Sequence, residues 1–435
     1  MRVISIIAIA LCCAATTVAQ DTLRLTLDDA IALAMQHNFD VRLARQDSLL
    51  ALNTSETSIT GFLPTVNLNG ATSTGKTDLR QQMADGRLIS KDQAGITNLN
   101  GGATLSWVLF DGLGMFASRD KLDAMKEQGL ARVRATMQTV IADVVTAYYY
   151  LVANQQYIST VDSAMVLAVQ RFEIAEQQYS TGLYSGVELS QARIDLNSQK
   201  ALSLKLHADE ANASSALLTL LGKSQQAIVL TNTASTDQQV PPVTTLIRDL
   251  DSLNPDVMAL QKALEAASAH VREANAAFFP RLGVSASYQF NRTNQDAGFV
   301  LQNQTAGWNL GAQLQWNIFN GFADNLARER ALIQVEKAAI DIESLRNDLK
   351  GRLDRTYRSY TTATEQLELE QASYSDALQN ASVAVSGLRI GTVSAIEVRQ
   401  ALLTLLQVGE NIAQRAYERR LAATELLRLT GRLVR

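Results

Sequence analysis

One turn occurs twice in this sequence of 435 residues, at a fixed distance along the chain. YSTGLYSGVELSQAR begins at residue 179, and LRIGTVSAIEVRQAL begins at residue 388. Gly182, Ser185 and Glu188 of the first copy each recur as the same residue type 209 positions later. Self-similarity at a fixed offset constrains the architecture of a whole chain. The sequence therefore predicts an internal two-fold repeat, with two halves of the same design.

The repeat extends over nearly the whole chain. The offset is 216 residues near the start of each half and 209 from Trp107 onward, so the first half carries seven extra residues. They fall within GKTDLRQQMADGRLISKDQAG, residues 75–95, where we predict a loop because loops tolerate insertions. The matched groups are Asn38-Phe39-Asp40 with Asn254-Pro255-Asp256, Phe62-Leu63-Pro64 with Phe278-Phe279-Pro280, Trp107 with Trp316, and Asp111-Gly112 with Asn320-Gly321.

The N-terminus has the three parts of a secretory signal peptide. A basic residue precedes an apolar run that ends at Cys13, and small residues close the segment at Ala19. We predict removal of residues 1–19, and the alternative of a permanent membrane helix is disfavoured because the run is short for spanning. Both cysteines lie in this segment, so the mature chain has no thiol for a disulfide or a metal site. Leu11 and Cys12 are poor residues before a lipid-attachment cysteine, so no lipoprotein is predicted.

The remaining chain is divided by composition. Residues 20–221 form the first repeat and residues 245–435 the second. Residues 222–244 are rich in Ser, Thr, Gln and Pro and are predicted to link them. No other segment has the ~20 consecutive apolar residues that a spanning helix needs. If the mature protein enters a membrane, it does so by strands.

Within each half, apolar residues first recur at every second position and then at the spacing of a helix. Alternation predicts strands at about 65–80 and 96–110 in the first half, and at about 281–292 and 306–319 in the second. A soluble sandwich also has one apolar and one polar face, but it needs more and shorter strands. Strands of about ten residues with tryptophan near an end are typical of outer membrane barrels. In the best-defined strand the apolar face consists of Leu282, Val284, Ala286, Tyr288 and Phe290.

Four strands cannot close a barrel, and an open sheet edge cannot lie in lipid because its backbone groups have no partner there. The chain is therefore predicted to oligomerise. Two copies would give eight strands around an interior filled by side chains, and three would give twelve strands around a lumen. The polar face, made of Asn, Gln, Ser and Gly, favours the trimer with its wet interior.

Each second strand is followed by a long helical pattern. No proline interrupts residues 113–181 or 322–389, and at 1.5 Å per residue each helix would be ~100 Å long. The chain has only five prolines in all. The second long helix has the apolar spacing of a coiled coil. This seam consists of Val335, Ala338, Ile342, Leu345 and Leu349.

The sequence lacks the residue patterns of an enzyme. His37, His207 and His270 are scattered and have no neighbouring ligand pattern, and no glycine-rich phosphate loop occurs. The net charge of −4 is spread without a basic run, so nucleic acid is not expected as a partner. We predict no catalytic residues, no cofactor and no metal site.

These features together resemble the outer membrane efflux proteins of the TolC type. The resemblance rests on the paired Leu-Pro or Phe-Pro before each strand pair, the Asn-x-Asp groups, the Asp-Gly or Asn-Gly before each long helix, and the paired turns, and it covers about Leu25 to Leu433. It implies a homotrimer with a twelve-stranded barrel in the outer membrane of a Gram-negative bacterium. A helical coiled-coil barrel would continue it through the periplasm. It also implies two partners, a periplasmic adaptor protein and an inner-membrane transporter of the RND, ABC or MFS type.

The paired turns are the candidate functional site. Ser185 with Glu188, and Ser394 with Glu397, have the spacing of a capping box, which is a purely structural role. Three-fold symmetry would also set each carboxylate in a ring that favours cations. The resemblance implies that Glu397 belongs to an acidic ring at the periplasmic aperture and that Glu188 helps to hold the aperture shut.

The residues of the family's closing network are only partly present. A tyrosine of some members falls at Leu388 and an arginine at Val393, so a different latch is needed. We hypothesise that Arg389 or Arg399 pairs with Glu188, with solvated surface arginines as the alternative. The resemblance also implies the adaptor-contact residues Gly182, Leu183, Gly391, Thr392 and Val393.

The function expected is an exit duct of a tripartite efflux or type I secretion system. The alternatives are a passive trimeric porin, an adhesin-like coiled-coil protein and a purely structural periplasmic scaffold. Paired helical turns at a tip argue against an adhesin, since a stalk does not need them. No ladder of Met, His or Cys favours metal export, while drugs, protein toxins and metabolites remain possible cargo.

Overall fold

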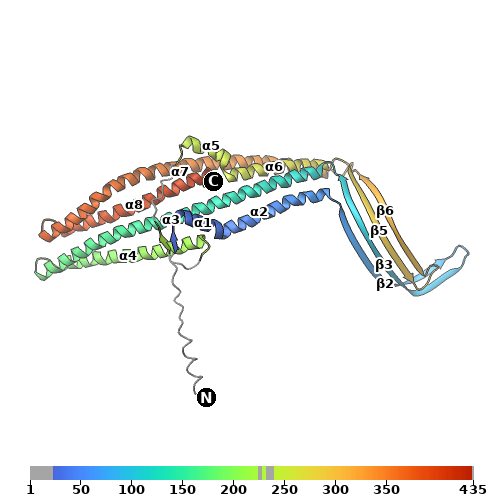
Figure 1. Ribbon diagram of the computed structural model, residues 1–435, viewed down its shortest axis with the longest axis horizontal. Helices are drawn as coiled ribbons and strands as arrows, with labels where there is room; N and C mark the ends of the chain where they lie inside the picture. Colours follow the sequence, from blue (N-terminus) through green and yellow to red (C-terminus); the bar gives the residue numbers. More distant parts are fainter. Residues whose placement is uncertain (1–22, 224–227, 232–239, 434–435) are drawn as a thin grey trace, which may run out of the picture. The chain divides into compact units, whose positions relative to one another are not determined.

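The computed structural model describes residues 23–223, 228–231 and 240–433 (Figure 1). The predicted signal peptide, residues 1–19, lies outside the described residues, as does part of the predicted linker. The described chain combines long helices with one four-stranded sheet and a short two-stranded one, so the fold is of the α+β class and mostly helical.

The chain is divided into two compact units. The sheet unit consists of Asp47–Ala131 and Met258–Ser344. The helical unit consists, among the described residues, of 23–46, 132–223, 228–231, 240–257 and 345–433. Each unit thus draws on both halves of the sequence.

The four strands predicted from alternation pair in one antiparallel sheet of order β2-β3-β5-β6 (Figure 1). β2 covers Thr65–Gln82, β3 Leu88–Phe110, β5 Arg281–Gln295 and β6 Gln302–Gln315. The sheet is open, because β2 and β6 each have a partner on one side only.

The register of the sheet sorts its side chains by polarity. Residues directly opposite each other form rows across the four strands, and successive rows alternate between the two faces. One face therefore carries rows of uncharged polar and small residues, and the other carries apolar rows. A polar row consists of Asn67, Thr104, Ser287 and Asn309, and an apolar row consists of Leu68, Ala103, Tyr288 and Trp308.

The predicted loop lies within residues 75–95 but is much shorter than this segment, most of which belongs to the two strands. β2 and β3 continue as a paired ladder to Gln82 opposite Leu88, with a bulge between Thr77 and Leu79. The true turn is short, and Gly86 adopts a φ of 85° in it. The charged and glutamine-rich side chains of this extension are mostly exposed. Strand β3 accordingly begins well before residue 96.

The last strand also differs from its prediction of 306–319. β6 begins at Gln302 and ends at Gln315, opposite Arg281, the first residue of β5. Pro280 precedes β5 and has no N–H with which to extend the ladder. Trp316 lies just beyond the strand, where its indole Nε1 donates a hydrogen bond of 3.1 Å to the carbonyl of Phe278.

Matching contacts hold the equivalent junction in the first half. The indole Nε1 of Trp107 donates to the carbonyl of Phe62 at 2.8 Å. The turns from strand to long helix also match, because Leu113 and Phe322 both adopt the left-handed conformation, with φ of 69° and 66°. Non-glycine residues seldom adopt it. Both follow a glycine that is also left-handed.

The long helices are α3, Gly114–Ser180, and α7, Ala323–Ile390, as the proline-free segments predict. The predicted seam of α7 is covered, since Ile342 and Leu349 are buried. Shorter helices complete the two halves. These are α1 (Leu27–His37), α2 (Phe39–Thr57), α4 (Gly186–Leu220), α5 (Val243–Leu253), α6 (Pro255–Ala276) and α8 (Ala395–Leu429).

In the helical unit, α3 with α4 and α7 with α8 form two hairpins whose turns lie at the same end (Figure 1). Each hairpin packs on one short helix, α1 or α5 respectively. The first half adds a parallel pair of short strands, β1 (Leu23–Leu25) and β4 (Ile228–Leu230). Equivalent positions form the two cores, namely Val140, Val144 and Leu217 in one and Leu349, Leu353 and Leu426 in the other.

Candidate functional site

The two turns close their helices by the same backbone geometry. In the first, the N–H of Leu183 donates to the carbonyl of Gln178 at 2.9 Å, and that of Gly182 donates to Tyr179 at 3.0 Å. This pair of bonds is a Schellman motif, which needs a left-handed residue. Gly182 supplies it with a φ of 79°, and Gly391 does so in the second turn with a φ of 80°.

The next helix begins with a glutamate that folds back on its cap residue. The amide and hydroxyl of Ser185 donate to the Glu188 carboxylate at 2.7 and 2.6 Å. In the second turn the amide of Ser394 donates to Glu397 at 2.7 Å, and the amide of Glu397 donates to the Ser394 hydroxyl at 3.3 Å. The structural role predicted for both glutamates is therefore present within one chain.

These bonds favour the charged form of both glutamates. Two hydrogen bonds from Ser185 hold the pKa of the Glu188 carboxyl below its usual value. The bond from the hydroxyl has the larger effect and the bond from the amide the smaller. The pKa of Glu397 is lowered in the same way by Ser394, where the bond from the amide has the larger effect and the bond with the hydroxyl the smaller. Both carboxylates are exposed and carry a full negative charge at neutral pH.

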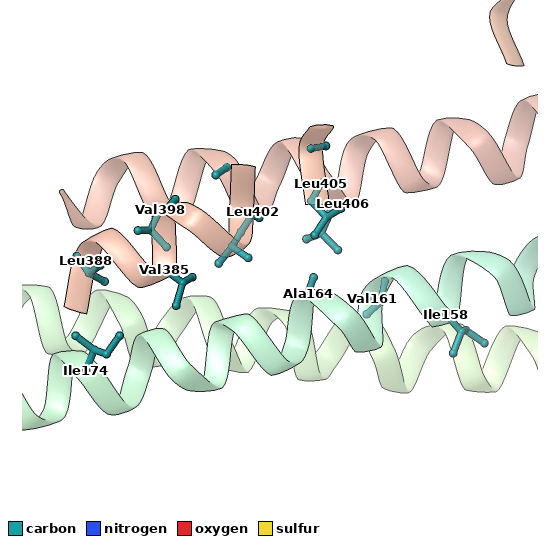
Figure 2. Packing of buried hydrophobic residues seen from close by; sticks show 14 of the residues in the cluster. Ile158, Val161, Ala164, Ile174, Val385, Leu388, Val398, Leu402, Leu405 and Leu406 are labelled. Atoms are coloured by element: carbon teal, nitrogen blue, oxygen red, sulfur yellow. The ribbon is translucent and has the colours of Figure 1, made fainter. Parts of the chain in front are cut away.

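A hydrophobic core fixes the two hairpins to each other behind the turns (Figure 2). Val161 and Ile174 of α3 point toward side chains of α7 and α8, and Ile158 belongs to the same core. Leu388, the position of the family's tyrosine, is 2% exposed and belongs to this core. It cannot supply a polar latch.

The predicted pair between Glu188 and Arg389 or Arg399 is not formed within one chain. Glu188 is engaged by Ser185, and Arg389 makes no ion pair with the residues that the structure describes. The guanidinium of Arg399 instead lies 3.7 Å from the carboxylate of Asp195.

Asp195 is the centre of a charged cluster that links three helices. Its carboxylate binds Arg171 of α3 at 2.6 Å and accepts a bond from Gln191 of α4 at 2.8 Å. Arg399 reaches it from α8. The side chain of Arg171 is only 6% exposed, and its Nε has no hydrogen-bond partner in the described structure.

Sequence reasoning did not find this cluster. The repeat gave no signal, because the residue 209 positions after Asp195 is Thr404. The one available hint is helical spacing, since Asp195 follows Gln191 by four residues and Glu188 by seven on the same helix face. The buried partner Arg171 is on another helix.

The outer surface of the turns is apolar. Leu183 and Val187 are each 77% exposed at the first turn. Ile390 and Ile396 are 75% and 79% exposed at the second. Large aliphatic side chains exposed together at both tips indicate a surface that a partner covers.

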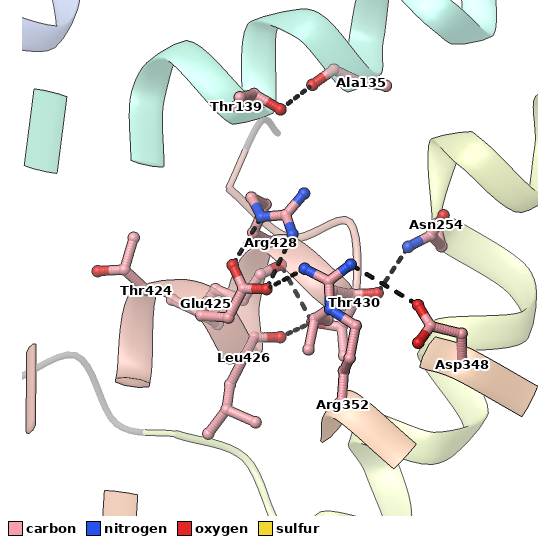
Figure 3. Close-up of polar contacts among 12 residues, drawn as sticks. Ala135, Thr139, Asn254, Asp348, Arg352, Thr424, Glu425, Leu426, Arg428 and Thr430 are labelled. Atoms are coloured by element: carbon pink, nitrogen blue, oxygen red, sulfur yellow. Dashed lines mark hydrogen bonds and ion pairs between the residues drawn. The ribbon is translucent and has the colours of Figure 1, made fainter. Parts of the chain in front are cut away.

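A second polar cluster lies in the helical unit, far along the hairpins from the turns (Figure 3). Glu425 accepts bonds from Arg352 at 2.9 Å and from Arg428 at 2.7 and 2.8 Å. Burial raises the pKa of Glu425, but the two guanidiniums outweigh it and hold the pKa below its usual value. The cluster joins α7 to α8 and has a structural role.

The described residues contain neither a metal-binding cluster nor a membrane-spanning helix. No group of three or more His, Cys, Asp or Glu side chains there is placed to hold a metal ion. No described helix has a stretch long and apolar enough to cross a bilayer.

Long paired helical hairpins and an open sheet with one apolar and one polar face are the fold of solved outer membrane channel proteins. The solved structure of CusC, described in terms of transmembrane channel formation, superposes with a TM-score of 0.79 over 94% of this chain and 93% of that chain, at 18% identity. This likeness concerns the fold.

The chain belongs to the outer membrane efflux protein family, which it matches over residues 30–223 and 246–432. It is accordingly an outer membrane protein. The probable outer membrane lipoprotein SilC of Salmonella typhimurium is 27% identical over 60% of this chain and 57% of the relative. The pyoverdine export outer membrane protein OpmQ of Pseudomonas aeruginosa is 28% identical over 72% of this chain and 66% of the relative. Each match spans less than two thirds of the relative's length.

Proposed function

We propose that this chain forms, as a homotrimer, the outer membrane exit duct of a tripartite efflux or type I secretion system. The observation that carries the proposal is the four-stranded sheet, whose register separates an uncharged polar face from an apolar face. Such a sheet meets lipid on one side and water on the other. The name of the family refers to efflux and that of OpmQ to export. Both favour a duct over a passive porin or an adhesin.

The open edges of the sheet require other copies of the chain. β2 and β6 leave a row of backbone groups without partners, and lipid supplies none. Joining β6 of one copy to β2 of the next closes the sheet without an edge. Three copies give twelve strands, which leave a lumen, and the polar face with Asn98 hydrogen-bonded to Ser73 and Thr293 suits water there.

The helices next to the two edge strands also have uncovered apolar faces. Leu326, Ile333 and Ile340 of α7 recur every seven residues and are 50–58% exposed. Leu49 and Leu50 of α2 are 56% and 65% exposed. Seven-residue spacing is that of a coiled-coil seam. We assign the exposed apolar faces of α7 and α2 to contacts between copies of the chain. These contacts would form the helical tunnel.

The two halves of the chain are proposed to descend from one duplicated unit. This is supported by the paired indole bonds of Trp107 and Trp316 and by the paired left-handed residues Leu113 and Phe322. Two similar halves in each of three copies would give the tunnel a nearly six-fold wall.

The turns are proposed as the periplasmic aperture and the docking surface. Rings of Glu188 and Glu397, with Arg389 and Arg399 nearby, would set the charge of the aperture. The adaptor would contact the turn residues and the exposed aliphatic side chains, and an inner-membrane transporter of the RND, ABC or MFS type would deliver cargo. The turn residues assigned to the adaptor are Gly182, Leu183, Gly391, Thr392 and Val393.

Two measurements test the proposal. The purified chain should have the mass of three copies in detergent and should form discrete conducting channels in planar bilayers. A photo-reactive residue at Leu183 should crosslink to the co-expressed adaptor, whereas one at Leu204, which is 72% exposed on α4 but away from the turn, should not. Equal crosslinking at both positions, or none at either, would contradict the assigned docking surface.

A further inference from the structure

One arginine stands apart in the four-stranded sheet. All four strands are paired over residues 65–74, 97–106, 285–294 and 302–311. Arg292 is the one charged residue in these four described segments. A single charge in these otherwise neutral segments calls for a physical reason.

The register places Arg292 on the apolar face. It lies two residues after Phe290 and four after Tyr288 on β5, so all three share a face. Its row across the sheet is Thr72, Leu99, Arg292 and Gln304, and the next row outward on the same face is Thr74, Thr97, Asn294 and Gln302. Arg292 therefore marks the level at which the apolar face becomes polar.

In the proposed duct, this level matches the expected edge of the hydrocarbon layer. From Val284, in the row of Trp107, eight residues lead to Arg292, a distance of ~26 Å along the strand. The apolar band of an outer membrane barrel is ~25 Å tall and is bordered by aromatic residues. Tyr288 and Trp308 lie just below Arg292, and Trp107 lies at the opposite end. The strand ends near Arg292 lead into the turns of the sheet, which face the outside in the proposed duct.

The guanidinium of Arg292 has no partner among the described residues. The side chain is exposed and makes no hydrogen bond or ion pair with the described residues. A lipid-facing arginine costs ~2–4 kcal/mol at the bilayer centre but only ~0–1 near the interface, where lipid phosphates lie. Arginine binds a phosphate through two parallel N–H donors. Lys76, exposed on the same face of β2 two rows further out, adds a second cation.

We propose that Arg292 binds the phosphate headgroup of a lipid in the outer leaflet and thereby anchors the outer rim of the sheet. The proposal rests on the proposed function, because it requires the apolar face to meet lipid. The ligand is an anionic phosphorylated lipid, recognised by a cation placed at the depth of its headgroup.

The test uses the full chain in vesicles of phosphatidylcholine, alone or mixed with lipid A or with dephosphorylated lipid A. Retained lipid is measured by native mass spectrometry, and the melting temperature by circular dichroism. The wild type should retain lipid A and melt at a higher temperature with it than with the dephosphorylated form. Arg292→Gln should reduce retention about tenfold, which corresponds to ~1.4 kcal/mol, and should abolish the temperature shift. Arg292→Lys should retain lipid A to a degree between the wild type and Arg292→Gln, since lysine keeps the charge and loses the two-donor geometry.

Arg87→Gln is the matched control, because Arg87 lies in the turn beyond the four-stranded part and is already paired with Asp85 at 2.7 Å. It should behave as the wild type does. If Arg292→Gln and the wild type retain lipid A equally in vesicles where both insert, the inference is overturned and the proposed function is not. The guanidinium would then contact only water. Failure of the wild type to insert in any vesicle would overturn the proposed function and this inference with it.

Discussion

The side-chain amide of Asn254 donates a hydrogen bond of 2.9 Å to the carbonyl of Leu429, 175 residues away. Its Oδ1 accepts bonds from the amides of Asp256 and Val257 at the start of α6. Asn38 makes the same three contacts in the first half, with Leu220 in the place of Leu429. One buried asparagine in each half thus begins one helix and ties it to the end of another, which explains the paired Asn-x-Asp groups in the sequence.

Replacing this asparagine should destabilise the fold. Asn254→Ala removes a helix cap, worth ~1 kcal/mol, and leaves the Leu429 carbonyl buried without a partner, at ~1–3 kcal/mol. We expect a loss of about 2 kcal/mol and a lower melting temperature in detergent. Asn254→Asp keeps the cap acceptor and should lose less. Asn53→Ala, at an exposed position of α2, should change the melting temperature little, and an equal loss there would contradict this account.

The cluster around Asp195 should hold the two hairpins together. Asp195→Asn leaves the guanidinium of Arg171, whose side chain is 6% exposed, without its charged partner. Breaking a buried pair in this way costs about 3 kcal/mol. We expect a lower melting temperature and a higher single-channel conductance in planar bilayers. The control is Asp354→Asn, which breaks an exposed pair with Arg358 and should have little effect on either.

Acid should loosen the turns. The pKa values of Glu188 and Glu397 are lowered in the folded protein, so their stabilising bonds are fully present above the usual glutamate value of 4.5. They are lost as the pH falls below 4.5 through the folded-state pKa values. Conductance should therefore be constant from neutral pH down to this range and change below it. A change centred near neutral pH would point to another group.

A substitution separates the capping role of Glu397 from its charge. Glutamine also completes a capping box, so Glu397→Gln should keep the start of α8 and the melting temperature. It should reduce cation selectivity, measured as the reversal potential in a salt gradient, if a ring of three carboxylates sets the field of the aperture. An unchanged reversal potential would leave Glu397 with the capping role alone.

Replacing either turn glycine by alanine should destabilise the turn, because the backbone there adopts a left-handed conformation. No atom lies within 4 Å of a Cβ added at Gly182 or Gly391, so there is no clash. Their φ values of 79° and 80° nevertheless cost an L-residue ~1–2 kcal/mol. Gly391→Ala should lower the melting temperature and weaken adaptor crosslinking. Gly307→Ala, equally open but with an ordinary φ, should be tolerated, and equal sensitivity of both would contradict the strain argument.

Much of the fold follows from local sequence. Alternation located the four strands, the absence of proline located α3 and α7, and Gly182 with Ser185 located the turn between helices. These features depend on residues within a few positions of each other, so a single sequence displays them. The turn contacts of Glu188 and Glu397 were predictable for the same reason, because a cap and its third residue are neighbours.

Only the tertiary structure decided which distant residues meet. The continuation of β3 back to Leu88 and the end of β6 at Gln315 depend on how far the partner strand runs, which no local pattern records. The pairing of Arg399 with Asp195, instead of Glu188, depends on how α8 packs against α4. The sequence by itself determined the elements and the turns, while packing across elements far apart in the chain selected the ion pairs and the strand ends.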